Sequence, residues 1–294
     1  MNISSRDHHI FEEVARGNGL LRWYAIADSA QQKALPFAIQ QPGFKARCLF
    51  DSSQRSPVAA QTPHLAEIGS PLNKNAAWRW ISNHRRVEAC ITVIATELDF
   101  KCLWNHLSIC TECTLPDGDA IFLAFWDPAV LGSLIGQPDD HTLHVKGPVL
   151  RSAQKNALFR NLKNWWYWDR LGTTHSIDVT ENKATYEAFP IRLSQDQVDD
   201  LVEGSVPDHI LYYIESNQPT LISDFAPSHR YEFIVQSLAK AREIELSSMK
   251  DLVNFVCLKL IYRKRIHQEK IVIDAFEKLF RRELAFHDLI DQLP

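Results

Sequence analysis

Two aspartates stand at the ends of segments that we expect to be β-strands, and they are the first candidates for chemistry. Asp28 closes the apolar run 23–28, and Asp51 follows the run 47–50. In open α/β sheets ligands bind beyond the carboxyl ends of the strands, where two carboxylates could hold Mg²⁺ and a phosphate. The alternative is that Asp28 caps the next helix and Asp51 shapes a turn. The sequence favours this alternative, because capping is the commonest role of aspartate in such a place. Neither strand is followed by a Gly-rich phosphate-binding loop, which disfavours nucleotide binding.

Cysteine and histidine pairs indicate metal binding only weakly. Cys110 and Cys113 have the spacing of half a zinc site or of a redox pair. Residues three apart in a strand point to opposite faces, so we interpret both as small buried side chains. His141 and His144 would share one face of a helix, yet they lie in an expected loop. We therefore expect no metal and no other cofactor.

The densest aromatic cluster is the run Trp165, Trp166, Tyr167 and Trp168. Four consecutive large aromatic side chains cannot all face one core on a regular element, because successive side chains point in different directions. We expect some of them either to anchor a protein partner or to pack one lobe of the protein onto the other.

A short basic run, Arg263, Lys264 and Arg265, separates two expected helices. Such a run is typical of a solvated helix end, where the helix dipole favours positive charge. The functional alternative is contact with an acidic patch on a partner.

Composition limits the function classes. The chain has 294 residues, 45% of them hydrophobic, with 32 basic and 36 acidic residues. This balance does not indicate nucleic-acid binding, which usually needs a basic footprint. The N-terminus lacks the pattern of a signal peptide, and no apolar run approaches the ~18 residues of a membrane span. We expect a cytoplasmic protein that is not bound to a membrane and whose six cysteines are reduced.

The pattern along the chain predicts an α+β protein in three segments: an α/β lobe with a mixed sheet at 1–150, an aromatic-rich connector at 151–190, and an all-helical lobe at 191–294. In the first lobe, strands at 23–28 and 47–50 flank a helix at 29–40, a rhythm that favours parallel pairing. We interpret 51–63 as a loop.

Later segments of the first lobe carry clearer local signals. A strand is expected at 87–95, and a capping box at Thr96–Asp99 predicts a helix that ends near His106. Pro116–Asp119 predicts a hairpin turn, and the apolar run 120–126 predicts a strand inside the sheet. Asp127 followed by Pro128 predicts the start of a helix.

In the last lobe, a capping box at 194–197 starts one helix and Pro207 opens another. Three further helices are expected at 228–244, after a cap at Ser247 or Ser248, and at 266–282, from apolar residues at helical spacing.

Several of these residues form motifs in a fixed order. They are Tyr24 to Asp28, then Cys48, Phe50 and Asp51, then His106-Leu107, then Leu115-Pro116-Asp117-Gly118, and finally Trp126-Asp127-Pro128-Ala129-Val130-Leu131. In these motifs the chain resembles the type VI secretion adaptor chaperones, over residues 20 to 150. The chain departs from the family at Ala129 and at Leu123 or Ala124, where the family usually has arginine.

The resemblance implies a non-catalytic cytoplasmic adaptor. Proteins of this family are thought to bind a toxic effector and to help load it onto the VgrG spike protein. The expected partners are therefore an effector and VgrG, and the resemblance leaves the oligomeric state open. Two alternatives remain: a small metal-dependent phosphotransferase or hydrolase that uses Asp28 and Asp51, and a stable structural subunit of a larger assembly.

Overall fold

A six-stranded antiparallel sheet forms the centre of the N-terminal part of the chain. The computed structural model describes residues 5–28, 45–50, 62–73, 75–84, 90–179, 185–263 and 268–293. The strand order is β2-β3-β1-β4-β7-β8, and every neighbouring pair is antiparallel. The strands are β1 (Arg22–Asp28), β2 (Ala46–Cys48), β3 (Pro63–Glu67), β4 (Ile91–Thr96), β7 (Leu162–Trp168) and β8 (Thr174–Ile177).

The expected parallel pair is wrong. β3 lies between β1 and β2 and pairs with both in antiparallel register. The sequence pattern missed β3 because this strand has only five residues and begins with a proline, Pro63, which is disfavoured in most strands. The helix expected at 29–40 lies outside the described residues.

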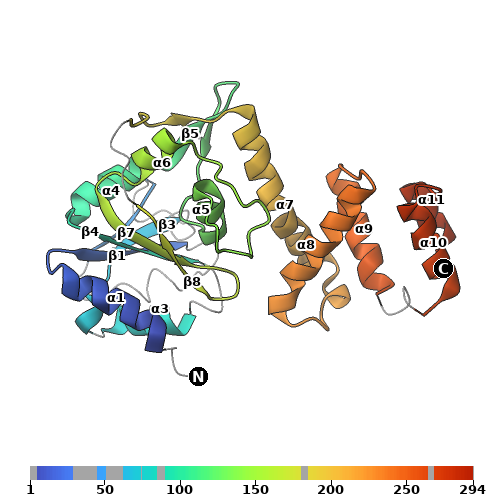
Figure 1. The fold of residues 1–294 in the computed structure, drawn as a ribbon, viewed down its shortest axis with the longest axis horizontal. Coiled ribbons are helices and arrows are strands. Elements are labelled where there is room, and N and C mark those ends of the chain that lie inside the picture. Colours follow the sequence, from blue (N-terminus) through green and yellow to red (C-terminus); the bar gives the residue numbers. More distant parts are fainter. Residues whose placement is uncertain are drawn as a thin grey trace. The chain divides into compact units, whose positions relative to one another are not determined.

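Helices cover both faces of this sheet (Figure 1). On one face α1 (Ser5–Gly17) and α3 (Ala76–His84) contribute to a core that contains Trp23 and Trp166. On the other face α4 (Phe100–Ile109), α5 (Pro128–Ile135) and α6 (Ser152–Leu158) contribute to a core that contains Tyr24 and Trp165. Since side chains alternate along a strand, each central strand supplies residues to two separate cores.

A second, three-stranded sheet has the order β6-β5-β9. The hairpin predicted around Asp117 connects β5 (Glu112–Thr114) to β6 (Ala120–Phe122), and Gly118 supplies the positive φ of +101° in its turn. β9 (Ile191–Arg192) pairs in parallel with β5. The expectation that 120–126 lies inside a sheet is wrong: β6 is an exposed edge strand, and the chain leaves it after Phe122.

Two predicted helix starts had different outcomes. Asp127 caps α5 as predicted, because its carboxylate accepts hydrogen bonds from the backbone N–H groups of Ala129 and Val130. The capping box at Thr96 is wrong. The cap of α4 is Asp99, whose side chain accepts from the N–H of Cys102, while the Thr96 hydroxyl donates to the carbonyl of Asn161. The helix also continues past His106 to Ile109.

Helices dominate the remainder of the chain: α7 (Gln195–Asn217), α8 (Pro227–Glu243), α9 (Met249–Ile261), α10 (Lys270–Phe280) and α11 (Phe286–Gln292). The predicted break at Pro207 is wrong, because α7 continues through this residue. Val206 and Ile210 are buried in the helical core on either side of Pro207, so tertiary packing outweighs the local cost of the proline.

The chain divides into two compact units, residues 1–201 and 202–294. The predicted boundaries at 150 and 190 differ from this division, because β7 and β8 belong to the central sheet of the first unit. The α+β class, with an N-terminal sheet and a helical C-terminal region, is confirmed.

Candidate functional site

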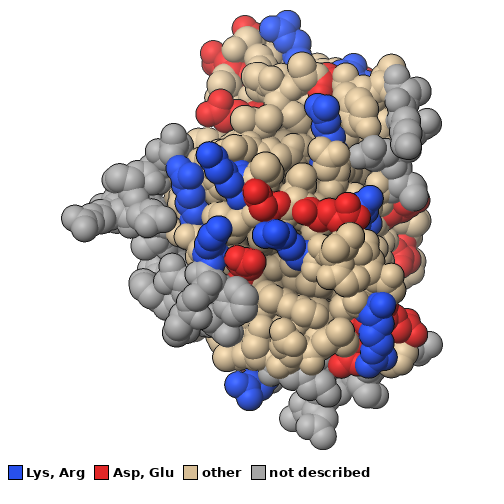
Figure 2. Space-filling view, turned by 90° about the vertical axis from the view of Figure 1, so that its left-hand side faces the viewer, with Lys and Arg blue, Asp and Glu red and all other residues tan. Residues whose placement is uncertain are grey.

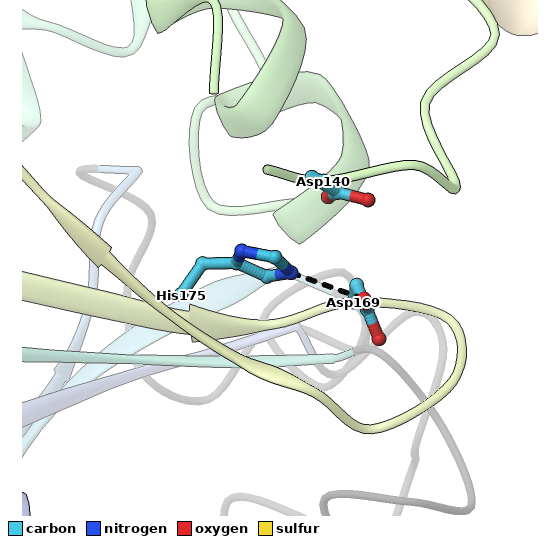
Figure 3. A group of neighbouring side chains, drawn as sticks. All are labelled: Asp140, Asp169 and His175. Carbon is cyan, nitrogen blue, oxygen red and sulfur yellow. Dashed lines mark hydrogen bonds and ion pairs between the residues drawn. The ribbon is translucent and has the colours of Figure 1, made fainter. Parts of the chain in front are cut away.

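Three buried ionisable side chains converge at one end of the central sheet. Asp140 lies in the loop after α5, Asp169 directly follows β7, and His175 lies on β8 (Figure 3). Their exposed fractions are 1%, 7% and 2%. One ligand atom from each lies within 4.8 Å of the others. Among the described residues, these three side chains form the only group of this kind that could hold a metal ion.

The β7–β8 turn fixes Asp169. Its Oδ1 accepts hydrogen bonds from the backbone N–H groups of Leu171 and Thr173, both at 2.8 Å. Its Oδ2 lies 3.0 Å from Nε2 of His175. One oxygen therefore closes the turn and the other faces the imidazole.

Asp140 is held in a similar way. Its Oδ1 accepts from the N–H and the hydroxyl of Thr142, at 2.8 and 2.7 Å, and its Oδ2 accepts from the Tyr167 hydroxyl at 2.8 Å. Gly132 on α5 leaves room for this hydroxyl, because a Cβ at Gly132 would lie 2.7 Å from the Tyr167 oxygen. The absence of a side chain at 132 thus allows Tyr167 to reach Asp140.

The surrounding charges shift the pKa values in this cluster. Burial alone would lower the pKa of His175, but the hydrogen bond to Asp169 and the negative charges of Asp140, Asp169 and Asp139 outweigh it and raise that pKa. Burial would raise the pKa of Asp169, yet its hydrogen bonds to His175 and to the turn lower it. Burial and the charge of Asp140 raise the pKa of Tyr167 far above its ordinary value, so its hydroxyl stays a donor.

Sequence reasoning missed this cluster. Its members come from a loop, a turn and a strand, so no motif spacing joins them. The nearby pair His141 and His144 attracted attention instead, but neither histidine belongs to the cluster. The only local signal was the turn sequence from Asp169 to Gly172, which resembles an Asp-initiated β-turn.

The aromatic run at 165–168 is buried, so the expectation of exposed interface anchors is wrong. Trp165 and Tyr167 lie in the core under α4, α5 and α6, whereas Trp166 and Trp168 lie in the core under α1 and α3. Because the sheet is covered on both faces, all four side chains are buried without sharing one core. The packing also lies inside the first unit, rather than between two lobes.

The basic run lies only partly within the described residues. Arg263 forms an ion pair with Asp224, at 2.5 Å between Nη2 and Oδ2, and its guanidinium lies 4.7 Å from the centre of the Phe225 ring. This side chain is therefore already bound within the helical unit. Lys264 and Arg265 lie outside the described residues.

Of the two aspartates that could have held Mg²⁺, only Asp28 is described. It ends β1 and is buried, with its backbone N–H bonded to the carbonyl of Cys90. Asp51 lies outside the described residues.

The other motif residues form internal contacts. The Tyr24 hydroxyl donates to the carbonyl of Leu98, and burial raises the Tyr24 pKa to about 12. The carbonyl of Cys48 accepts from the indole of Trp104. Nε2 of His106 lies 2.9 Å from the carbonyl oxygen of Leu158. Leu107 is buried, and the ring of Phe50 packs against Trp126. Asp117 and Gly118 form the hairpin turn, and Asp127 and Pro128 start α5.

Cys110 and Cys113 are both buried, as predicted. Burial raises the pKa of the Cys110 thiol well above its usual range and that of Cys113 to about 11. Neither thiol is therefore activated as a nucleophile at neutral pH.

Exposed apolar side chains occur in both units. In the first unit, Ile121 and Phe122 on the edge strand β6 are exposed, and the Phe122 ring stacks on Phe50 at 4.4 Å between centroids. In the second unit, α7 exposes Tyr212 and Tyr213. Figure 2 shows one face of the molecule on which lysine and arginine side chains lie among acidic ones, rather than in a uniform basic patch. Large exposed apolar side chains are typical of protein contact surfaces.

None of the helices in the described part of the chain combines the length and apolar character that a bilayer-spanning segment requires.

Comparison with known proteins gives one match. Residues 23–145 match the family model described as "Domain of unknown function (DUF4123)". No curated protein and no solved structure matches the chain. The matched segment runs from β1 to the loop after α5 and contains the motifs between Tyr24 and Leu131 that resemble the adaptor family. The chain therefore contains a segment similar to this family.

Proposed function

We propose that this protein is a cytoplasmic adaptor of a type VI secretion system, which binds a toxic effector, helps to load it onto the VgrG spike protein and catalyses no reaction. The family match over residues 23–145 carries the proposal, because the same segment holds the motifs that resemble the adaptor chaperones.

The roles of the motif residues support a binding scaffold. Asp117 and Asp127 accept hydrogen bonds from the backbone in a turn and in a helix cap. His106 and Tyr24 bond to backbone carbonyls. These groups stabilise the fold, which is what a protein that works through its surface requires of a shared motif.

The exposed apolar residues provide candidate contact surfaces. Phe122 is 59% exposed on an edge strand, and Tyr212 is 73% exposed on α7. Aromatic side chains that become buried in a complex often supply much of its binding free energy. We propose that one unit contacts the effector and the other contacts VgrG or the N-terminal segment of the effector.

Co-expression tests the proposal. The chain is produced with a candidate VgrG spike protein and a candidate effector toxin, singly and together, and each mixture is separated by size-exclusion chromatography. We expect co-elution with the toxin at low and moderate salt. Elution of the chain alone in every mixture would contradict the adaptor function. Constant co-elution in a complex that never releases the toxin would favour the structural-subunit alternative.

Two variants assign the surfaces. Phe122→Ser alters the first unit and Tyr212→Ser the second, and both remove an exposed aromatic ring without opening a buried core. If a ring lies in the contact, its loss should weaken binding by about 1–4 kcal/mol. Exposed Leu20→Ser is the matched control and should leave co-elution unchanged.

A further inference from the structure

The buried cluster around His175 has an excess of negative charge. Asp140 and Asp169 are almost fully buried, and Asp139 lies at the edge, with its Oδ1 3.4 Å from Nδ1 of His175. Within this group of four side chains, three carboxylates share a single imidazole. Buried charges in proteins are normally paired or bound to a metal ion.

The two oxygens of each buried carboxylate, Asp140 and Asp169, make different contacts. Oδ1 of Asp140 and Oδ1 of Asp169 each accept two hydrogen bonds from their own loops. The loops thereby fix each carboxylate through its Oδ1 and leave its Oδ2 for a second contact. Oδ2 of Asp169 faces Nε2 of His175, and Oδ2 of Asp140 is oriented by the Tyr167 hydroxyl. Figure 3 shows the imidazole and both carboxylates converging from separate segments of the chain.

The separations suit a shared ion. An ion bonded at ~2.1 Å to each of two ligands holds them about 3.0–3.4 Å apart, depending on its geometry. Nε2 of His175 and Oδ2 of Asp169 are 3.0 Å apart, and all three ligand atoms lie within 4.8 Å of one another. Asp169 and His175 therefore have the spacing of two ligands on one ion, and Asp140 lies near enough to be considered as the third.

The second nitrogen of His175 gives an independent indication. His175 is only 2% exposed, and its Nδ1 makes no hydrogen bond among the described residues. Its nearest carboxylate oxygen is Oδ1 of Asp139, at 3.4 Å, within ion-pair distance but without hydrogen-bond geometry. A histidine that binds a metal through one nitrogen almost always donates its other N–H to a carboxylate, a carbonyl or water. Asp139 stands where that partner belongs.

We propose that Asp140, Asp169 and His175 bind one divalent transition-metal ion, with Asp139 as the carboxylate behind the imidazole. One nitrogen and two oxygen ligands suit Mn²⁺, Fe²⁺ or Zn²⁺. When the ion occupies Nε2, the imidazole keeps one proton, on Nδ1, where Asp139 can accept it. Because the site is closed to solvent, the ion is structural: it joins the loop after α5 to the β7–β8 hairpin.

Metal uptake by the full-length chain tests the proposal directly. The chain is stripped with a chelator, dialysed against Mn²⁺ or Zn²⁺, and analysed for bound metal. Thermal unfolding is followed in parallel. We expect one equivalent of at least one of the two ions per chain and a higher melting temperature, since a ligand that binds only the folded state stabilises it.

Variants show where the ion binds. His175→Gln should abolish the uptake, and Asp139→Asn should weaken it by about 10–100-fold, as loss of a partner behind a metal ligand does. Asp139 is 67% exposed, so this second variant keeps the test valid if His175→Gln fails to fold. Asp119→Asn, on the exposed hairpin turn, is the matched control and should bind as the wild type does.

Two results would contradict the proposed metal site. A wild-type chain that takes up neither ion would overturn the proposal and leave the cluster as a hydrogen-bonded network. Uptake that is unchanged by Asp139→Asn would place the ion elsewhere, for example on surface histidines or thiols, and would overturn it too.

Discussion

The burial of Trp166 allows a sharp test of the two-core architecture. This side chain is 1% exposed, its ring stacks on Trp23 with centroids 5.6 Å apart, and it meets Phe11 edge-on at 5.1 Å. A buried tryptophan removes about 150–250 Å² from water, which at ~25 cal/mol per Å² corresponds to about 4–6 kcal/mol. Since the alanine variant keeps Cβ and neighbours relax, we expect Trp166→Ala to lower the free energy of unfolding by about 3–5 kcal/mol.

A conservative variant separates the contribution of packing from that of the indole N–H. Nε1 of Trp166 is buried without a hydrogen-bond partner among the described residues, which costs about 1–3 kcal/mol. Trp166→Phe removes this unpaired donor and loses part of the ring volume. The two effects oppose each other, so we expect a free energy of unfolding within ~1.5 kcal/mol of the wild type.

The assay uses the distribution of tryptophans. All eight tryptophans lie between residues 23 and 168, within the unit that spans residues 1–201. Tryptophan fluorescence during urea unfolding therefore follows the first unit alone, even if the helical unit unfolds separately. The matched control is Leu20→Ala, an exposed apolar residue of the same unit, expected to change stability by less than ~0.5 kcal/mol. A loss below ~1 kcal/mol for Trp166→Ala would refute the two-core packing and restore the surface interpretation of the aromatic run.

Three further predictions concern other parts of the fold. Cys102 is the only one of the six cysteines that is exposed, and Cys257 is half-buried. A thiol reagent should therefore modify Cys102 first in the native chain and all six after unfolding. Fast modification of Cys110 or Cys113, mapped by mass spectrometry, would contradict their burial. Burial lowers the pKa of His106 below its ordinary 6.5. Just below pH 6.5, His106 is therefore protonated in the unfolded chain while it stays neutral in the folded chain. Stability should therefore fall as the pH drops below that value, and His106→Gln, compared with His9→Gln in urea unfolding in the presence of a chelator, should reduce this loss. Gly132→Ala would place a Cβ 2.7 Å from the Tyr167 oxygen and 3.0 Å from Leu143, so it should destabilise the first unit by about 1–3 kcal/mol. The control is Gly17→Ala, whose Cβ would meet nothing within 4 Å and which should not lower stability.

The candidate site could not be predicted from the sequence alone. Asp140 and Asp169 are separated by 28 intervening residues, and each looks like an ordinary turn residue within its own segment. Their carboxylates come together because α5 and β7 pack on each other through Gly132 and Tyr167. No pattern of spacing encodes such a contact, so the sequence drew attention to the adjacent His141 and His144 instead.

Local signals predicted local structure well. Asp127 caps α5, Ser248 caps α9, and the turn at Asp117 joins two strands, because a cap or a turn depends only on residues within a few positions of each other. The cap of α4 was misplaced by three residues, from Thr96 to Asp99. The threonine hydroxyl instead donates to the carbonyl of Asn161, a partner that local reasoning does not consider.

The sequence by itself determined the α+β class, the hairpin, most of the helices of the C-terminal unit and the similarity of residues 23–145 to a known family. Only the tertiary structure decided the strand order, the insertion of β3 between β1 and β2, and the burial of Trp165–Trp168 in two cores. The physical reason is the distance along the chain between the residues that determine each feature. Caps, turns and helical periodicity are set by neighbours in the sequence, whereas strand pairing and burial on both faces of a sheet depend on segments tens of residues away.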